Sequence, residues 1–542
     1  MRELYINGSV ATVDSKMSYV EAFAVEDGKF IKTGTNEEIL ALKTADSAVV
    51  DLGGKTVMPG FNDAHLHILN WASYHGEDRA KIDLEGVTSI EELIEKVREY
   101  IQEKNIPEGK WVVGRGWNEN NYAEKRCINY ADLDRISTVH PIVLTRIDEH
   151  VVAVNSLGLE RIGITDKTPN PAGGHIQRDE NGKATGLLQE NARYMAYALL
   201  PDADVKQIKK LLINVMDHIS KLGITSVSTD DFETFSSKNW KYILQAYKEL
   251  EEEGKLKVRI TEQCLLITKP QLLEFLDAGY KTGWGSDMFK IGPLKVVSDG
   301  TIGSATALLQ APYSDHPETC GMAEFEEEVM DDLIITAHKG GMQILCHTIG
   351  DGAAKMCLRA FDQMLAIKPV DDPRCGLVHV QIADQEIFDK MRDNKVMAFI
   401  QPINAGTDMQ CAESRVGSER MKYSYRYRTM YDHGIITPFT SDWPVDSVNV
   451  FDSVYVATTR KNLQGQPEGG WYPEERFDPE QALRGFTIIP AYTSYDEDKK
   501  GSIEEGKFAD FVILSDDFTK IDPEHVRDIQ VLGVYLGGKK VN

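Results

Sequence analysis

The sequence predicts an α/β protein built on a (β/α)8 TIM-like barrel, with a small β-sandwich domain formed from both termini and an inserted α/β lid subdomain. Three observations predict this organisation: strand-like and helix-like segments alternate through the middle of the chain, both ends have all-β character, and one long segment interrupts the alternation. At 542 residues the chain also exceeds the size, about 250–300 residues, at which a single hydrophobic core stops growing.

The bulk composition is that of a globular protein, with 42% hydrophobic and 27% charged residues. A formal net charge of −25 argues against a nucleic-acid partner, and the absence of any 18-residue apolar run argues against a membrane partner. The seven cysteines are scattered and form no C-x-x-C pair, which fits reduced thiols. We therefore expect a cytoplasmic protein with a small-molecule substrate. Whether the chain forms a homo-oligomer such as a dimer is left open by the sequence.

The two chain ends are expected to form one composite β-sandwich domain, residues 1–57 plus 490–542. "ELYINGSVATVD" and "VEAFAVEDGKFIKTG" alternate apolar and polar residues around N-G and D-G turn signals. The segment "GSIEEGKFADFVILSDD" near the other end has the same character. The enclosed residues, 58–489, are then the barrel domain.

Eight candidate strands separated by helix-like stretches predict the barrel. The first lies in "VMPGFNDAHLHI" (57–68), and the other seven are "GITSVSTDD" (223–231), "KVRITEQCLL" (257–266), "LKVVSDG" (294–300), "MQILCHT" (342–348), "CGLVHVQI" (375–382), "KVMAFIQP" (395–402) and "GIITPFTSDWP" (434–444). Helix-like stretches such as "DGAAKMCLRAFDQMLAI" lie between most of them. Eight strands is the count of such a barrel, although a doubly wound sheet also alternates in this way.

The segment 70–215 is too long for a connection between two barrel strands. It contains a predicted helix at 89–103, a strand-like "KWVVGRGW" and a glycine-rich hairpin, "PAGGHIQRDENGKATGLLQE". We interpret it as an inserted lid or small α/β subdomain over the barrel mouth.

Side chains that bind metal ions recur at the predicted strand ends, where barrel enzymes place their active sites. His65 and His67 end the first strand, and side chains at i and i+2 of a strand point to the same face. The other candidates are Lys295 at the start of strand four, His347 at the end of strand five, His379 in strand six and Asp442 at the end of strand eight. Imidazole nitrogens and carboxylate oxygens are ligands that zinc-class ions accept.

Each of these residues also has a purely structural interpretation. Two histidines at i and i+2 often only pack, His379 could be a core histidine, and Asp442 could be a turn residue. Lys295 is harder to explain, because a buried ammonium is costly without a partner. The recurrence of such residues at successive strand ends favours a metal site.

Several motifs together resemble the amidohydrolase superfamily, and more narrowly amidohydrolase family 3, the branch that contains N-substituted formamide deformylases. They are "PGFNDAHLH", "LKVVSDGTIGSATA", "LCHTIGDGA", "LVHVQ" and "FTSDWPV", and the resemblance covers nearly the whole chain. It implies a metal-dependent hydrolase of a non-peptide C–N (amide) bond, with an N-substituted formamide as a candidate substrate. A deaminase, a cyclic amide or urea hydrolase, and a non-catalytic regulatory protein on the same scaffold stay open as alternatives.

The resemblance also implies a metal site with one or two divalent ions, for which zinc is the default. His65, His67 and Asp442 would hold the more buried ion, and His347 and His379 a second one. Lys295 would bridge the two as N6-carboxylysine. A divalent ion lowers the pKa of bound water from 15.7 to about 7 and so supplies hydroxide. Asp442 and His347 are the expected catalytic residues, with Asp442 passing the proton to the departing amine.

The substrate-binding residues that we expect are Trp117, His150 and Asp299. Trp117 in "GRGWNENNY" and His150 in "RIDEHVVAVNS" lie in segments that, by the resemblance, line the pocket. His150 could stabilise an oxyanion or only structure the insertion. Asp299, just past Lys295, is expected to orient ligands.

Overall fold

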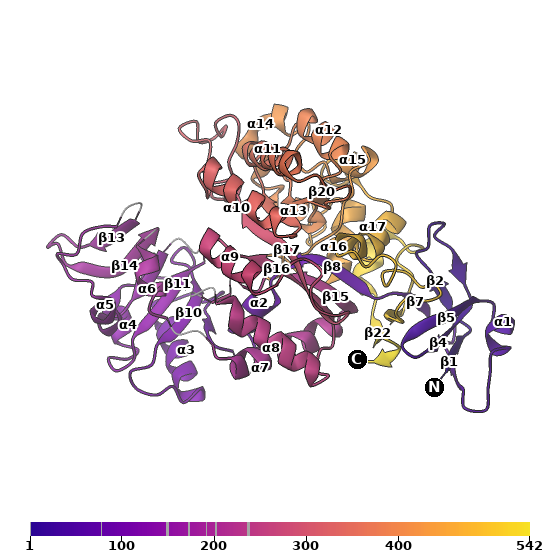
Figure 1. Cartoon of the computed structure of the whole chain (residues 1–542). Helices are drawn as coiled ribbons and strands as arrows, with labels where there is room; N and C mark the ends of the chain where they lie inside the picture. Colours follow the sequence, from indigo (N-terminus) through magenta and orange to yellow (C-terminus); the bar gives the residue numbers. More distant parts are fainter. Residues whose placement is uncertain are drawn as a thin grey trace. The chain divides into compact units, whose positions relative to one another are not determined.

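The computed structural model describes residues 2–76, 79–147, 151–171, 174–190, 192–200, 203–232, 234–235 and 239–542. The chain divides into two compact units (Figure 1). Unit 1 comprises Met1–Ile68, Val215–Phe232 and Tyr247–Asn542, and unit 2 comprises Leu69–Asn214 and Glu233–Ala246. Each unit is described by itself below.

The centre of unit 1 is a seven-stranded parallel sheet that is nearly closed into a barrel. Its strands, in sheet order, are β20 (Met397–Phe399), β19 (Gly376–His379), β18 (Ile344–Thr348), β17 (Phe289–Val297), β16 (Arg259–Leu265), β15 (Ile224–Thr229) and β8 (Phe61–Leu66). Almost every residue of these strands is buried, as expected for parallel strands that are covered on both faces. The α/β barrel architecture predicted from the sequence is confirmed at this level.

The eighth predicted strand, residues 434–444, is not a regular strand, because Ile400 and Phe439 form only an isolated parallel bridge. The segment still connects the two edges of the sheet. The amide of Ile400, just after β20, donates to the carbonyl of Pro438 at 3.0 Å, and the amide of Asp442 donates to the carbonyl of His65 at 3.0 Å. Pro438 has no N–H, so the ladder is interrupted at this residue.

The strand that contains Lys295 begins earlier than predicted. β17 starts at Phe289, so Lys295 lies in its carboxyl-terminal half and does not open it. Gly292 and Pro293, which usually weaken strands, obscure this start in the sequence. In the structure the register between β16 and β17 shifts near this point, between the partners of Glu262 and Cys264.

Helices follow most of the barrel strands (Figure 1). Those between β15 and β20 are α8 (Trp240–Glu252), α9 (Lys269–Asp277), α10 (Glu327–Lys339), α11 (Asp351–Ile367) and α12 (Gln385–Asp393). Those after β20 are α13 (Pro402–Asp408), α14 (Ala412–Arg420), α15 (Tyr427–Asp432), α16 (Val450–Thr459), α17 (Pro479–Gly485) and α18 (Ile488–Thr493), with 3-10 turns η1 (Pro473–Glu475) and η2 (Pro523–Asp528). Side-chain caps begin several of them: Asp384 accepts from the amide of Ile387 at the start of α12.

Unit 1 contains two further sheets, one made of strands from the amino-terminal end alone and one made of strands from both chain ends. One has the order β5 (Lys29–Gly34), β4 (Ala22–Glu26), β1 (Glu3–Ile6) and β6 (Ala48–Asp51), and α1 (Asn36–Leu40) follows β5. The other has the order β23 (Lys539–Lys540), β22 (Val531–Leu536), β21 (Phe511–Leu514), β7 (Thr56–Pro59), β2 (Ser9–Ala11) and β3 (Tyr19–Val20). Tyr5, Phe23 and Phe511 share one aromatic core, with the rings of Phe23 and Phe511 5.0 Å apart. The sandwich description and the boundaries at residues 57 and 490 stay predictions.

Unit 2 has its own six-stranded sheet and hydrophobic core. The sheet order is β13 (Gly174–Arg178), β14 (Ala184–Glu190), β12 (Val151–Val154), β11 (Ile142–Arg146), β10 (Val112–Trp117) and β9 (Ile82–Asp83). Its helices are α3 (Ile90–Glu103), α4 (Tyr130–Asp134), α5 (Ser156–Ile162) and α6 (Arg193–Tyr197). The boundaries between the two units fall within three further helices, α2 (Ile68–Tyr74), α7 (Val205–Ser220) and α8. Its action as a lid stays a prediction.

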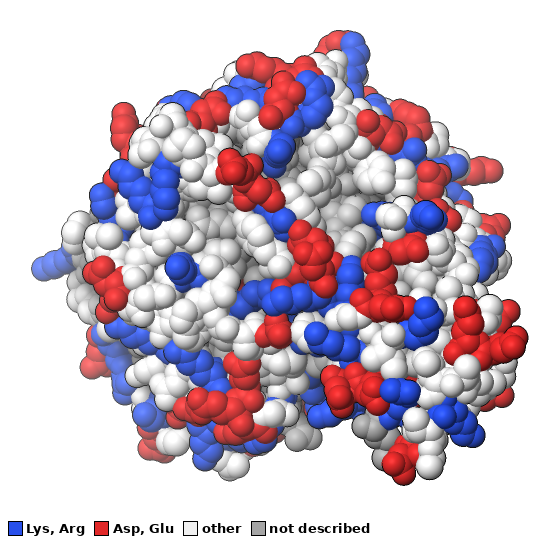
Figure 2. All heavy atoms as spheres, turned by 45° about the vertical axis from the view of Figure 1, so that its right-hand side comes forward, with Lys and Arg blue, Asp and Glu red and all other residues white. Residues whose placement is uncertain are grey.

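In the described part of the chain, no helix combines the length and the apolar character needed to cross a bilayer. Figure 2 shows basic and acidic side chains interspersed on the face that it presents.

Candidate metal centre

His65, His67 and Asp442 converge at the carboxyl ends of β8 and of the closing segment. One ligand atom from each lies within 4.8 Å of the other two, and this is the one such group of His, Cys, Asp or Glu among the described residues. Oδ1 of Asp442 is 3.3 Å from Nε2 of His65 and 3.2 Å from Nε2 of His67. The imidazoles of the H-x-H motif therefore reach one carboxylate from one face, as the i, i+2 argument predicts.

His347 and His379 form a second pair beside the first group. They end β18 and β19, which are neighbours in the sheet, and Nδ1 of His347 lies 2.9 Å from Nε2 of His379. The rings of His65 and His379 are 6.3 Å apart, so the two groups adjoin. Lys295 lies between them and is buried, with its Nζ 2.9 Å from Nε2 of His65. The structure thus brings all six predicted ligands together.

Acceptors outside the cluster orient the buried imidazoles. The Nδ1 atoms of His65 and His379 face the side-chain oxygens of Gln263 at 2.5 Å and of Gln401 at 2.6 Å. Gln263 is itself oriented, because its Nε2 donates to the carbonyl of Ala64. These contacts assign the N–H to the outer nitrogen of each ring and direct the lone pair of Nε2 inward.

His347 is oriented in the same way through its other nitrogen. Its Nε2 faces the carbonyl of Gly300 at 3.4 Å and the carboxylate of Asp299 at 3.6 Å. The lone pairs of Nδ1 of His347 and Nε2 of His379 then point toward each other and would repel without a proton or cation between them. The donor set therefore fits a divalent cation of the zinc class.

The protonation preferences of the cluster suit metal ligation. Burial and the neighbouring Lys295 ammonium lower the pKa of His65 to about 4, and burial and His347 hold the pKa of His379 well below its usual value. Burial alone would raise the pKa of Asp442, but its contacts with the imidazoles of His65 and His67 outweigh this effect and hold it well below its usual value. Neutral imidazoles and an ionised carboxylate are the forms that bind metal.

The three predicted substrate-binding residues lie in different settings. Asp299 is buried and accepts from the backbone amides of Leu308, Ile349 and Gly350, so its described contacts hold loops and His347 in place. Trp117 is fully buried in the core of unit 2, and its indole N–H donates to the carbonyl of Leu144 at 2.8 Å. In this placement Trp117 offers no surface to a substrate. His150 lies outside the described residues.

Sequence reasoning missed the support behind His67. Nδ1 of His67 faces the carbonyl of Asp230, which follows β15. The next residue, Asp231, is buried, as are Glu262 and Tyr247. Oε1 of Glu262 accepts a hydrogen bond from the backbone amide of Asp231 at 3.1 Å. Burial raises the pKa of Glu262 well above its usual value. The sequence does contain an indication of this support, because the polar residues "TEQ" (261–263) interrupt an otherwise apolar strand. A buried polar side chain needs a hydrogen-bond partner, so these residues are candidates for such contacts. The same indication marks Gln263.

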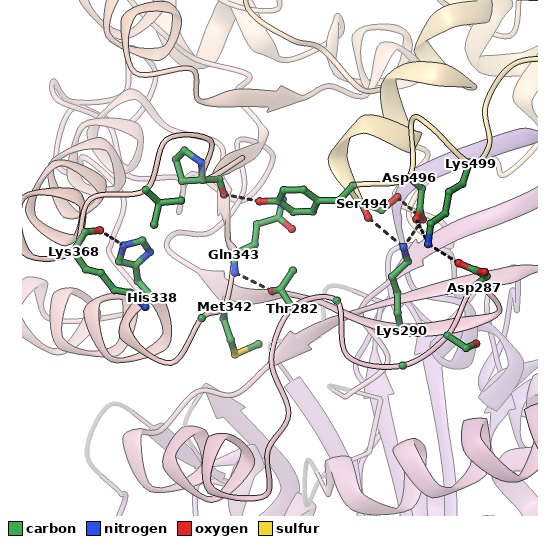
Figure 3. A pocket seen from close by; sticks show the side chains of 17 residues that line it. Thr282, Asp287, Lys290, His338, Met342, Gln343, Lys368, Ser494, Asp496 and Lys499 are labelled. Atoms are coloured by element: carbon green, nitrogen blue, oxygen red, sulfur yellow. Dashed lines mark hydrogen bonds and ion pairs between the residues drawn. The ribbon is translucent and has the colours of Figure 1, made fainter. Parts of the chain in front are cut away.

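A cavity of about 720 Å³ lies in unit 1 at the opposite, amino-terminal ends of the barrel strands. Lys290 at the start of β17, Gln343 before β18 and Pro373 before β19 line it. Figure 3 shows that the charged groups at one end pair with each other, Lys290 with Asp496 and Lys499 with Asp287. This cavity is therefore separate from the metal-ligand cluster.

Comparison with known proteins agrees with this site. Residues 48–542 match the model of the amidohydrolase family. The chain is 29% identical to a putative amidohydrolase YtcJ of Bacillus subtilis (strain 168) over 100% of this chain and 99% of that protein. It is 27% identical to an N-substituted formamide deformylase of Arthrobacter pascens over 99% and 98% of the two chains.

A solved structure of an uncharacterized metal-dependent hydrolase from Pyrococcus horikoshii OT3 is 26% identical and superposes with a TM-score of 0.80. The match covers 97% of this chain and 99% of that one. A family match over most of the chain, metal-dependent relatives and a cluster of metal-binding side chains at the barrel rim all agree. The chain belongs to the amidohydrolase family and is a metal-dependent hydrolase that acts on carbon–nitrogen bonds.

Proposed function

We propose that the protein hydrolyses a linear, non-peptide amide at the cluster formed by His65, His67, Lys295, His347, His379 and Asp442. The observation that carries the proposal is the convergence of His65, His67 and Asp442, whose ligand atoms lie within 4.8 Å of one another. They meet at the carboxyl ends of barrel strands, where such folds place their chemistry. His65, His67 and Asp442 would hold one ion, and His347, His379 and Lys295 a second.

Asp442 is the proposed proton carrier. A divalent ion, when bound, makes water nucleophilic near neutral pH and polarises a carbonyl. Asp442 is ionised and buried, so it can accept the proton of the attacking water and then deliver it to the amine nitrogen as the C–N bond breaks. Amines leave poorly unless they are protonated, so a single carboxylate that first accepts and then donates the proton serves both halves of the reaction.

An N-substituted formamide is the substrate that we propose to test first. One relative, 27% identical along nearly its whole length, bears the name of such a deformylase. A formamide has the smallest acyl group, and hydrolysis gives formate and an amine. Deamination of a heterocycle and hydrolysis of a cyclic amide or urea use the same cluster and are the alternatives that the substrate panel separates.

Lys295 is proposed to be carboxylated on Nζ. The ammonium would first lose a proton, and carbon dioxide would then add to the neutral amine with loss of a second proton, which replaces a buried cation by an anion beside His65. A bridging carbamate would complete the donor set of His347 and His379. The intact mass should exceed that of the Lys295→Ala variant by the side-chain difference plus one carbon dioxide, under native conditions and after growth in bicarbonate.

The test combines metal analysis with a substrate panel. We expect one to two equivalents of zinc in protein purified without chelators, loss of metal in His65→Ala, and hydrolysis of at least one N-substituted formamide. His525→Ala is the matched control, because His525 is exposed and remote in sequence from the cluster. Protein that binds no transition metal and hydrolyses no amide would overturn the proposal and favour the regulatory alternative.

A further inference from the structure

The cavity at the amino-terminal ends of the barrel strands has no part in the proposed hydrolysis (Figure 3). Its volume of about 720 Å³ falls within the range of about 300–1,000 Å³ that is typical of small-molecule sites. Its wall includes the start of β17 and residues just before β18 and β19. The same three strands carry Lys295, His347 and His379 toward their other ends. A molecule in this cavity therefore leaves the metal-ligand cluster free.

Three lysine ammonium groups surround one buried carboxylate at one end of the cavity. The carboxylate belongs to Asp496, whose side chain is 6% exposed and pairs with Nζ of Lys290. Nζ of Lys500 lies 3.5 Å from Oδ2 of Asp496, and Nζ of Lys499 lies 4.0 Å from its Oδ1. Nζ of Lys499 is also 2.7 Å from Oδ1 of Asp287. Three cations against two carboxylates give this end an excess of positive charge, although the whole chain has a net charge of −25.

Lys290 has a hydrogen-bond donor left over at the cavity. An ammonium group has three N–H donors. Two acceptors among the described residues contact Nζ of Lys290, the carboxylate of Asp496 and the carbonyl of Ser494 at 3.2 Å. Lys290 lines the cavity and its side chain is 12% exposed, so its third N–H is available to a ligand there.

The other end of the cavity also carries a cation, and the wall between the ends is largely apolar. Lys368 lies at that other end (Figure 3), where its Nζ donates to the carbonyl of Lys339 at 3.1 Å. It has no carboxylate partner within the described part of the chain. Gln343 is fixed in the wall, because its Nε2 donates to two backbone carbonyls at 2.7 and 3.1 Å. Apolar surface comes from Met342, Val370, Pro373 and the ring of Tyr495.

We infer that this cavity binds a small organic acid in its anionic form, with the acid group on the ammonium groups of Lys290 and Lys499. Hydrogen bonds from an ammonium to a carboxylate are among the strong ones, and both lysines can make one without giving up Asp496. The hydrocarbon part of the acid then packs on the apolar wall. The inference is independent of the proposed function, because none of the six metal-binding side chains lines the cavity.

Calorimetric titration of the full-length, metal-loaded protein with three probes tests the inference. Benzoate, benzyl alcohol and benzylamine have the same ring and differ in the charge of one group. We expect benzoate to bind about tenfold or more tightly than benzyl alcohol, the value of one hydrogen bond to a charged group, and benzylamine not to bind. Equal binding of benzoate and benzyl alcohol, or tighter binding of benzylamine, would overturn it.

A carboxylate can also bind a metal ion, so the same titration on His65→Ala locates the bound probe. Benzoate that occupies the cavity should bind this variant as it binds the wild type. Loss of benzoate binding in His65→Ala would place the probe at the metal centre and overturn the inference. Absence of benzoate binding to the wild type would also overturn it and leave the proposed function standing. Benzoate binding to a protein that hydrolyses no amide would support the cavity site alone.

Two lysine variants test the proposed contacts. Lys290→Met should weaken benzoate binding by about tenfold or more, and Asp496 keeps Lys500 as a partner. Lys499→Gln should weaken it as well, and this change at a half-exposed side chain keeps the test decisive if Lys290→Met does not fold. Lys422→Gln, an exposed lysine paired with Glu419, is the matched control and should bind benzoate like the wild type. Unchanged affinity in the folded cavity variants would overturn the inference.

Discussion

Nε2 of His67 lies 3.2 Å from Oδ1 of Asp442, although 375 residues separate them in the sequence. The contact exists because the segment around Asp442 takes the place of an eighth strand next to β8, where the amide of Asp442 donates to the carbonyl of His65. The metal-ligand cluster is therefore assembled at the seam where the barrel closes. Its integrity and the closure of the sheet depend on the same backbone contacts.

Asp442→Asn should abolish proton transfer while keeping the size of the side chain. We expect kcat/KM for the best amide to fall by about 100- to 10,000-fold, the range for loss of a general acid–base group. Steady-state kinetics and metal content are the measurements, and Asp432→Asn, a change at an exposed carboxylate at the end of α15, is the control. Full activity with a full metal complement would rule out Asp442 as the proton carrier.

Gln263→Leu and Gln401→Leu should weaken metal binding without removing a ligand. Each glutamine accepts from the outer nitrogen of a buried imidazole, and loss of such a partner typically lowers metal affinity by about 10- to 100-fold. Competition with a chelator measures the affinity. Gln385→Leu, on the exposed face of α12, should titrate like the wild type. Unchanged chelator curves for both core variants would contradict the assigned ring orientations.

Asp510→Ala should strongly destabilise unit 1. Asp510 precedes β21 and receives two hydrogen bonds from Arg259 of β16, at 2.6 and 2.9 Å, and both side chains are buried. Its removal leaves a buried, uncompensated guanidinium, which costs about 3–5 kcal/mol. The melting temperature should fall clearly, and the double variant Arg259→Met/Asp510→Leu should recover part of the loss. Glu91→Ala, which breaks an exposed pair with Arg135, should leave the unfolding free energy nearly unchanged.

Lys500 should make stability depend on pH in the alkaline range. Burial lowers its pKa from 10.5 to about 8, despite the nearby Asp496. Between these values the unfolded chain binds more protons than the folded one, so this residue makes the free energy of unfolding rise with pH, by at most about 1.4 kcal/mol per unit. Urea unfolding at several pH values, for the wild type and Lys500→Met, isolates the effect. Parallel curves for the two proteins would contradict it.

Local sequence pattern predicted most of the elements that position the site. Buried strands at 224–229, 344–348 and 376–379 lie inside the predicted segments, and the helix predicted over 89–103 is observed as Ile90–Glu103. These predictions held because apolar periodicity and capping residues act over only a few positions. The start of β17 was wrong by several residues, since Gly292 and Pro293 contradict strand propensity but are tolerated in this sheet.

The sequence alone predicted which side chains could bind metal and that they lie toward the carboxyl ends of strands in an α/β barrel. It could not identify Gln263 and Gln401 as the acceptors behind the imidazoles, or show that residues 436–443 close the sheet without forming a regular strand. These features depend on hydrogen bonds and charges between residues far apart in the chain, which local propensity does not encode and only the folded barrel brings within contact distance.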